Sequence, residues 1–451
     1  MKYFSPAKKL LLGVLTIFVT FIFIIVVINS SIFDEELSPQ VAETLKTIKM
    51  PANNKNAFFA IWGLSATSEK NVIETGKALI ARYRENRDKR GIDEITNEDY
   101  VEILGGENLD ASWEDDYERC NARREYGCTM KLTSQLDNKP IKDPRLLLML
   151  ERYEQITKMS NYQHIDHLTF ASPLPPYDIL MKLRGLKLAN ALGSENSYGL
   201  IQQLSQDLVF WRMMLEKGDT LIDKMVAIAG IWSDTQVISE YLVNQSTLAV
   251  DDLQMLNTLL EPLSQQELAI SEAFKFEQQS FYNTLNSSNR EQLEQAFGMV
   301  SKPLYWLIQK NATINDYQQY FVQPINQMNS LSTRDFYKAY NDKSTCCFKE
   351  LERLVNFSPS SLYNIGGKIL LSESLFGAQD YIARVHDLNG VISLVRLQLQ
   401  LMGLPDDTLG DLINRSKITN PYTGEPMTYD KKNNWLGFEC LNEGSLCKIE
   451  L

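Results

Sequence analysis

The sequence predicts a mainly α-helical protein with one N-terminal transmembrane helix, an antiparallel helical body and a small, disulfide-stapled β-hairpin at the C-terminus. Residues 10–28 form an uninterrupted apolar run, "LLLGVLTIFVTFIFIIVVI". Long stretches of the remaining chain place apolar residues three or four positions apart, which is the spacing of one helix face. Residues 420–447, in contrast, are rich in turn-forming and aromatic residues. The pattern leaves open whether the body is a bundle or an irregular solenoid.

The apolar run has the length of a membrane span. As a helix it would be about 28 Å long, close to the roughly 30 Å hydrocarbon core of a bilayer. Three lysines precede it and no acidic residue occurs before Asp34, so residues 1–9 are expected in the cytoplasm and the rest across the membrane. A cleaved signal peptide is the alternative, but its apolar region is normally about 7–15 residues long and ends at a better cleavage site than residues 29–31. We therefore expect an uncleaved, single-pass anchor.

The remaining chain divides into four predicted regions. Residues 33–54 are expected to form a juxtamembrane stalk, and residues 55–171 an N-terminal region that carries a cysteine loop. The proline-rich segment "FASPLPPYD" then marks the start of a helical body, residues 172–405, which is followed by a β cassette, residues 406–451.

The composition narrows the class of protein and partner. Acidic residues outnumber basic ones by 57 to 45, for a net charge of −12, which argues against a nucleic-acid partner. The chain is 44% hydrophobic and contains six tryptophans, which excludes a disordered tether. The part beyond the anchor is long enough for two or three ordinary domains.

Several helices can be placed individually. One is expected from Asn71 to about Asn86. Three more begin near Pro176, Ser194 and Asp219 or Thr220, and their short connections require antiparallel packing. The last runs from about Asp380 to Met402, with apolar residues in alternating steps of three and four. This pattern fits a coiled-coil seam between chains or a buried bundle helix, and its length of under three heptads favours the buried helix.

The cysteines predict two short disulfide loops. All six follow the membrane run, and an even number in an oxidising compartment favours disulfides. Cys120 with Cys128, and Cys440 with Cys447, would each close a small loop that stabilises the fold by roughly 2–3 kcal/mol. These four residues are the disulfide candidates.

The remaining two cysteines, Cys346 and Cys347, are adjacent. Their Cα atoms would lie about 3.8 Å apart, below the usual disulfide range of about 4.4–6.8 Å. We therefore expect them to be reduced or singly paired, with a strained bond between them as the alternative.

Metal-ligand residue types gather in two places, and neither predicts a site. In "HIDH", no strand or helix presents His164, Asp166 and His167 on one side, whereas a metal site needs three or four converging ligands. The acidic residues 114–116 are consecutive, whereas a calcium loop alternates its ligands. Both segments are expected to be polar loops.

Two further motifs are incomplete. "SESLFGAQ", residues 372–379, resembles part of the Glu-Ser signature of lytic transglycosylases, but their downstream Gly-Ala-x-Gly-Leu-Met-Gln element is absent, so Glu373 is expected to be a surface carboxylate. "NIGGKIL" lacks the hydroxyl of a phosphate-binding loop because Ile369 occupies that place. Gly366 and Gly367 are therefore interpreted as a break between helices. No catalytic, metal or cofactor site is predicted. Whether the protein is an enzyme stays open, and a non-enzymatic role is favoured.

Several stretches, taken in order, resemble an uncharacterised family of single-pass proteins of Gram-negative bacteria. They are "NAFFAIWGLSA", the Cys120/Cys128 spacing, "PLPPYDIL", "DLVFWRMMLEKGDTLIDKM" and "NPYTGEPMTYD". The resemblance implies an inner-membrane anchor and a helical periplasmic body, and it implies no activity. The adjacent cysteines are not part of the family's pattern.

The C-terminal cassette is predicted to be a cap on the helical body. "MTYD" and "WLGFEC" are expected to pair as a hairpin around "KKNN", and "CKIEL" is a possible third strand. A two-stranded hairpin is marginal alone, so the Cys440–Cys447 bond or packing on the helices must hold it.

These observations lead to one functional hypothesis and two alternatives. We expect a membrane-anchored periplasmic interaction or scaffold protein of the cell envelope, with an envelope protein as partner and an oligomeric state that the sequence leaves open. The first alternative is an envelope hydrolase acting on peptidoglycan or a related polymer. The second is a binder of a small hydrophobic ligand between helices.

Overall fold

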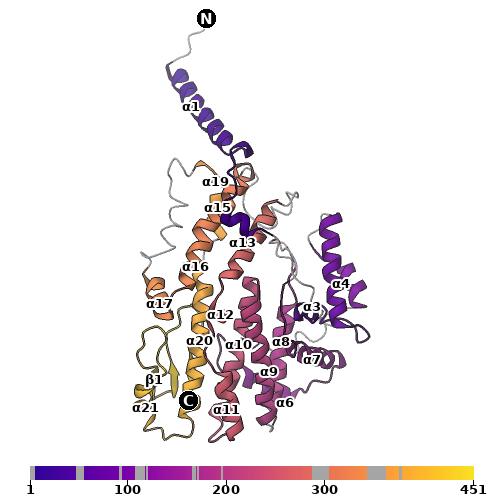
Figure 1. The fold of residues 1–451 in the computed structure, drawn as a ribbon, viewed down its shortest axis with the longest axis vertical. Helices are drawn as coiled ribbons and strands as arrows, with labels where there is room; N and C mark the ends of the chain where they lie inside the picture. The colour runs from indigo at the N-terminus through magenta and orange to yellow at the C-terminus, as the bar shows by residue number, and fades with distance from the viewer. Residues whose placement is uncertain are drawn as a thin grey trace.

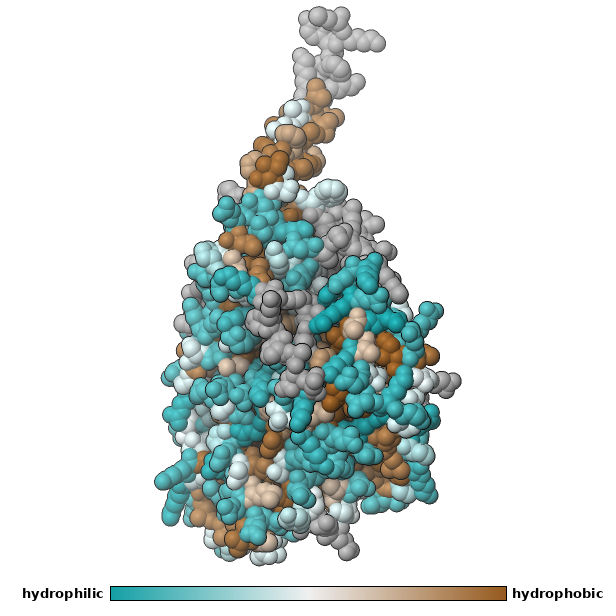
Figure 2. All heavy atoms as spheres, turned by 45° about the vertical axis from the view of Figure 1, so that its right-hand side comes forward, coloured by the Kyte–Doolittle hydropathy of each residue, from teal (hydrophilic) through white to brown (hydrophobic). Residues whose placement is uncertain are grey.

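The computed structural model shows a mainly helical chain with a projecting N-terminal helix and a small C-terminal sheet (Figure 1). It describes residues 6–46, 55–90, 94–106, 117, 120–164, 169, 172–194, 197–286, 304–342, 362–374 and 378–451. The predicted fold class is confirmed. In the space-filling view the projecting helix is strongly apolar, whereas the body carries a largely hydrophilic surface with scattered apolar patches (Figure 2).

Helix α1 (Pro6–Ile28) contains the predicted membrane span. Residues Leu10–Ile28 are long and apolar enough to cross a bilayer, and none of this span is buried in the protein. It is the one such helix in the described part of the chain. An exposed helix that is apolar on every side is stable only in an apolar surrounding, which fits a single-pass membrane anchor.

The segment after α1 is bonded to the body and does not form a free stalk. It contains η1 (Ser31–Phe33) and α2 (Pro39–Thr44). The Asp34 carboxylate accepts hydrogen bonds of 3.0 Å from the backbone N–H groups of Asn311 and Ala312, at the start of α15 (Lys310–Tyr317). A carboxylate there satisfies helix N–H groups that have no partner within the helix. The stalk prediction for residues 33–54 is therefore corrected for the described residues 33–46.

The N-terminal part of the body surrounds the buried helix α3. Its elements are α3 (Ala57–Trp62), α4 (Val72–Glu85), η2 (Asn86–Arg90), α5 (Asn97–Leu104), α6 (Cys128–Asn138) and α7 (Pro144–Thr157). Helix α4 corresponds to the helix expected from Asn71, whose side chain caps it. All six residues of α3 are buried. Helices α3 and α4 meet closely at Gly76, where a Cβ atom would lie 1.8 Å from the Phe59 carbonyl oxygen.

Three long helices form the centre of the body, as predicted. They are α8 (Tyr177–Leu192), α9 (Ser197–Lys217) and α10 (Leu221–Val243), and each contacts the other two. A fourth, α20 (Ala378–Leu401), packs along α10. Val385, Leu388 and Ile392 of α20 are buried within the chain. The apolar face of α20 is therefore part of the core of this chain. A coiled-coil contact with a second chain, the alternative considered from the sequence, is not needed to explain the apolar pattern.

The remaining described helices connect these parts. They are α11 (Val250–Leu259), α12 (Gln265–Leu268), α13 (Ser271–Asn286), η4 (Leu304–Leu307), η5 (Gln318–Val322), α16 (Gln323–Asn329), α17 (Thr333–Asn341), α19 (Ile365–Ser374) and α21 (Leu409–Arg415). Gly366 and Gly367 lie inside α19 and do not break a helix, contrary to the sequence interpretation. A Cβ atom at Gly367 would lie 2.0 Å from the Thr313 hydroxyl, so close packing explains this glycine.

The C-terminal cassette is a three-stranded antiparallel sheet in the order β1-β2-β3. Its strands are β1 (Thr428–Asp430), β2 (Trp435–Gly437) and β3 (Lys448–Glu450). Leu436 pairs with Ile449, and both side chains are fully buried. The predicted hairpin and its possible third strand are thus both present. The ring of Phe438 lies against Gly390 of α20, so the sheet is docked on the helical body.

Candidate functional site

A buried ionic cluster lies in the centre of the body. The Arg184 guanidinium on α8 donates to the Asp234 carboxylate on α10, and the Tyr153 hydroxyl donates to Asp207 on α9 at 3.0 Å. All four side chains are buried. Burial raises the pKa of Asp207 to about 6 and also raises the pKa of Asp234, and the Arg184 charge opposes both shifts. These groups join four helices and are enclosed by them, so the cluster is structural.

A second enclosed cluster lies where α10 begins. The hydroxyls of Tyr162 and Tyr177 both donate to the Asp223 carboxylate. Asp223 also forms a capping box with Thr220. Burial, and next the nearby Asp223 charge, raise the pKa of both tyrosines well above the usual value. This cluster fixes the start of α10.

Sequence reasoning missed both clusters, although one signal was present. The stretch "SDTQVISE" places polar residues at nearly every position of α10 between residues 233 and 240. Every residue of α10 from Gly230 to Leu242 is buried. A long helix with polar residues on all sides and no exposed face requires internal hydrogen-bond partners.

The "HIDH" histidine that the structure describes is a core residue. His164 is 2% exposed, and its ring centroid lies 4.4 Å from that of Phe58 and 5.7 Å from that of Phe276. Asp166 and His167 lie outside the described residues. So do the acidic residues 114–116, the two adjacent cysteines and the side chain of Glu373.

Among the described residues, one group of metal-ligand types is close enough to hold an ion, namely Asp387, Cys440 and Cys447. The two sulfur atoms are bonded to each other. The Asp387 carboxylate accepts hydrogen bonds from three donors, the Tyr422 hydroxyl and the backbone N–H groups of Leu441 and Asn442. This group is therefore part of the disulfide loop and does not fit a metal ion.

The four cysteine candidates form two disulfides. Cys120 is bonded to Cys128 and Cys440 to Cys447, with Cα–Cα distances of 5.3 and 5.6 Å. Both distances fall within the usual range for a disulfide. Each bond closes a short loop at the edge of the helical body.

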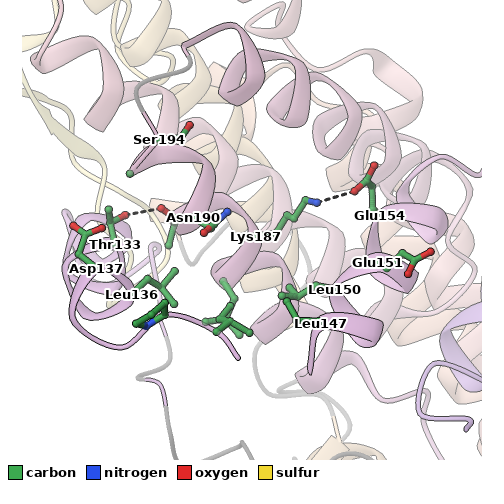
Figure 3. Close-up of a pocket in the computed structure, with 15 residues that line it drawn as sticks. Thr133, Leu136, Asp137, Leu147, Leu150, Glu151, Glu154, Lys187, Asn190 and Ser194 are labelled. Atoms are coloured by element: carbon green, nitrogen blue, oxygen red, sulfur yellow. Dashed lines mark hydrogen bonds and ion pairs between the residues drawn. The ribbon is translucent and has the colours of Figure 1, made fainter. Parts of the chain in front are cut away.

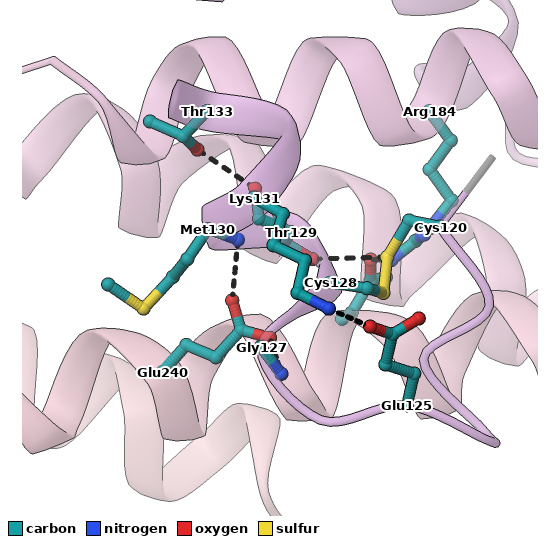
Figure 4. Close-up of a disulfide and its surroundings, with 11 residues drawn as sticks. Cys120, Glu125, Gly127, Cys128, Thr129, Met130, Lys131, Thr133, Arg184 and Glu240 are labelled. Carbon is teal, nitrogen blue, oxygen red and sulfur yellow. Dashed lines mark hydrogen bonds and ion pairs between the residues drawn. A yellow bond between two sulfur atoms is a disulfide. The ribbon is translucent and has the colours of Figure 1, made fainter. Parts of the chain in front are cut away.

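The Cys120–Cys128 loop is held by α10 (Figure 4). The Glu240 carboxylate accepts hydrogen bonds of 3.1 Å from the backbone N–H groups of Gly127 and Met130, where α6 begins. Burial raises the pKa of Glu240 to about 7, and the backbone hydrogen bonds oppose this shift. Gly127 has a φ of 78°, a conformation that favours glycine. The carboxylate therefore fixes both the loop and the first turn of α6.

The two disulfide loops meet. The backbone N–H of Leu446, inside the second loop, donates to the carbonyl oxygen of Arg123, inside the first loop, at 2.8 Å. Asn442 of the second loop accepts a hydrogen bond of 3.2 Å from the Arg384 side chain on α20. The cysteine spacing predicted each loop separately, and the structure brings the two loops together around two arginines.

A groove of about 530 Å³ opens beside these loops, between α8, α10 and α20. We call it the arginine groove. Its apolar wall consists of Met181, Leu221, Ile222, Met225, Val226 and Ala229, and Arg123 and Arg384 also line it. The Arg384 guanidinium lies over the Tyr381 ring at 5.1 Å from its centroid. Burial, and next the charge of Arg384, lower the pKa of Arg123. In the part of the chain that the structure describes, neither guanidinium forms an ion pair with a carboxylate.

A second groove of about 570 Å³ lies between α6, α7 and α8 (Figure 3). We call it the Lys187 groove, and its wall includes Leu136, Leu147 and Leu150. Lys187 reaches across it and forms an ion pair of 2.7 Å with Glu154. Asp137 and Glu151 also line this groove, so most of its charged side chains are carboxylates.

The arginine groove is the better candidate for a binding site because it combines an apolar wall with two cations and has no carboxylate among the described residues of its lining. Comparison with family models, with curated proteins and with solved structures gave no match to this chain.

Proposed function

We propose that this chain is a membrane-anchored interaction or scaffold protein of the bacterial cell envelope. In this proposal the N-terminus is cytoplasmic, α1 crosses the inner membrane, and the body lies in the periplasm. The lysines before the apolar helix support the orientation. The two disulfides suit a body in an oxidising compartment.

The observation that carries the proposal is the fixed connection between the anchor and the body. Asn29 directly follows α1 and is 1% exposed. Its side-chain amide donates to the Leu362 carbonyl at 2.8 Å, and its side-chain oxygen accepts from the Ile365 backbone N–H at 3.3 Å. Together with the Asp34 contacts to α15, these bonds hold the body in one orientation relative to the membrane helix. A fixed orientation suits a protein that presents a defined surface to a partner.

The titratable clusters support a binding role over a catalytic one. The Arg184 and Asp223 clusters are enclosed in the body. Catalytic acids and bases must be within hydrogen-bond reach of a substrate, which enclosed groups are not.

The test is photo-crosslinking in intact cells. A photo-crosslinking amino acid is placed at Val209 of α9 or at Val250 of α11, which are 63% and 78% exposed and lie on neighbouring helices. We expect a reproducible crosslink to an envelope protein. Failure to recover any reproducible partner from these and other exposed positions would contradict the proposal.

A matched variant tests the fixed connection. Asn29→Ala keeps the apolar run intact and removes the two side-chain bonds to residues 362 and 365. We expect the same amount of membrane-bound protein and a clearly reduced crosslink yield, because the body loses part of the bonding that orients it. An unchanged yield would show that the orientation is not what the partner requires.

A further inference from the structure

We propose that the arginine groove binds an anionic single-chain amphiphile, with its carboxylate head on Arg123 and Arg384 and its acyl chain along α10. This inference concerns a ligand and does not depend on the proposed envelope role. It is argued from the groove's apolar wall, from its charge and from the way its two arginines are held.

The apolar wall has the shape of a chain-binding site. Ile222, Met225, Val226 and Ala229 lie on one face of α10 at steps of three or four residues, and they remain partly exposed. Ser233, one turn further along α10, is buried and also lines the groove. From Ile222 to Ser233 the helix rises by about 16 Å. A long apolar slot with two methionine side chains can adapt to an acyl chain.

The charge of the groove is unusual for this protein. The chain carries a net charge of −12, yet the two charged side chains that line the groove are both arginines. Two like charges close together repel each other, which is unfavourable for the folded protein. An anionic ligand bound between them would offset this repulsion. An arginine guanidinium can bind a carboxylate through two parallel hydrogen bonds.

The nearest carboxylate is already engaged. Asp387 acts on Arg123 electrostatically, and its oxygen atoms accept hydrogen bonds from Tyr422, Leu441 and Asn442. Burial raises the pKa of Asp387 to about 6, and its hydrogen bonds oppose this shift. This carboxyl group therefore organises the second disulfide loop, and the Arg123 guanidinium and the Arg384 N–H groups that do not bind Asn442 or Met225 can bind a ligand.

Both arginines are positioned by that same loop. Leu446 binds the backbone of Arg123, and Asn442 binds the side chain of Arg384. Because residues 442 and 446 lie between Cys440 and Cys447, the loop fixes both cations beside the apolar slot, where the Arg384 guanidinium also donates to the Met225 sulfur at 3.6 Å. A head group with one negative charge and a tail without polar groups complements this arrangement. The groove volume also falls within the usual range of about 300–1,000 Å³ for small-molecule sites.

The test uses the full chain in nanodiscs of phosphatidylcholine and a palmitic acid that carries a diazirine. After irradiation, labelled peptides are located by mass spectrometry. We expect labelling on α1, which faces the lipid and serves as the internal reference, and on the 221–233 face of α10. Labelling confined to α1 would overturn the proposal.

Variants separate the head-group contact from the apolar slot. Arg123→Gln is expected to reduce groove labelling, relative to α1, by about tenfold, since hydrogen bonds to charged groups are strong. Ile222→Trp, at a side chain that is 39% exposed, is expected to reduce it similarly by filling the slot. Lys187→Gln, in the other groove, is the matched control and should change it less than twofold. Unchanged labelling in both groove variants would contradict the proposal.

A neutral probe tests the charge. Palmityl alcohol with the same diazirine is expected to label the groove at least about tenfold less than the acid. Equal labelling by the alcohol would show that the arginines do not recognise a head group. Each variant is also followed by thermal unfolding, and Arg123→Lys should restore part of the labelling.

Discussion

The arginine groove and the Lys187 groove have similar volumes and differ in their charges. Both are lined in part by α8, through Met181 in the first and Lys187 in the second. In the second groove Lys187 is paired with Glu154, whose pKa is lowered to about 2 by hydrogen bonds from Lys158 and Lys187. In the first, Arg123 faces another arginine. The grooves therefore differ in the sign of their charge, since two arginines line the first, whereas Lys187 and three carboxylates line the second.

Helix α8, which lines both grooves, also carries Arg184, a cation in a different environment. Arg184 lies between Met181 and Lys187 in sequence, and its guanidinium is buried against Asp234. A cation inside the core needs a carboxylate partner because removing its charge from water is costly. A cation that lines a groove remains accessible, and a bound anionic ligand can compensate its charge. The following predictions test this distinction, from the largest expected effect to the smallest.

We expect Arg184→Met to cause the largest loss of stability. The change leaves the carboxyl groups of Asp234 and Asp207 buried without their cation, which typically costs about 3–5 kcal/mol. Unfolding in denaturant measures the loss, which should be smaller at pH 5 than at pH 8 because protonation neutralises the carboxyl groups. Lys338→Met is the control, since the Lys338–Asp335 pair is exposed, with side-chain exposures of 75% and 57%, and its loss should cost less than about 1 kcal/mol. Equal losses in the two variants would contradict the distinction.

Glu240→Gln is expected to change the pH dependence of stability. The folded protein holds a proton on Glu240 more tightly than the unfolded chain, because burial raises this pKa to about 7. The stabilising contribution is therefore complete below about pH 4.5 and is lost as the pH rises through 7, for a total of about 3 kcal/mol. Denaturant unfolding between pH 4.5 and 8 should show a flatter profile in the variant. A profile parallel to that of the wild type would show that this group does not titrate in the range.

The loop of the second disulfide should affect one groove only. Changing both Cys440 and Cys447 to alanine is expected to lower the free energy of unfolding by about 2–3 kcal/mol. Hydrogen exchange should increase at residues 441–446 and around Arg123, and remain unchanged around Lys187. Changing Cys120 and Cys128 to alanine gives the comparison. Unaltered exchange at Arg123 would mean that the loop does not position it.

The smallest effect is expected for Lys187→Gln. The Lys187–Glu154 pair is partly exposed, with side-chain exposures of 26% and 35%, so its loss should cost less than about 1 kcal/mol. Thermal unfolding measures this directly. A loss of several kcal/mol would show that the pair is as important as the buried cluster and would remove the contrast between the grooves.

The sequence predicted the elements of the fold because their signals are local. The apolar run, the glycine and proline residues between helices and the short cysteine spacings all depend on neighbouring residues. Long-range contacts were missed for the same reason. Asp34 caps a helix that begins more than 270 residues later. No local pattern around Asp34 indicates this helix, so the segment was predicted to be a free stalk. Arg123 and Arg384 are similarly distant in sequence, and no motif joins them.

The polar residues of α10 contain a signal for buried hydrogen-bond partners that the sequence analysis did not use. Residues 233–240 are too polar for a buried helix unless partners exist, and Asp234 and Glu240 both have one. The pattern indicates that partners are required. It does not identify Arg184 or the start of α6 as those partners, because that depends on how the helices pack.

The contacts of Leu446 and Asn442 also set the order in which the molecule can mature. Arg123 is synthesised long before residue 446, so most of the helical body can fold while its groove still lacks one side. The arrangement of both arginines is complete only when residues 440–447 have been made and the Cys440–Cys447 bond has closed. A chain that ends before Cys440 keeps its anchor and its long helices and lacks the finished groove.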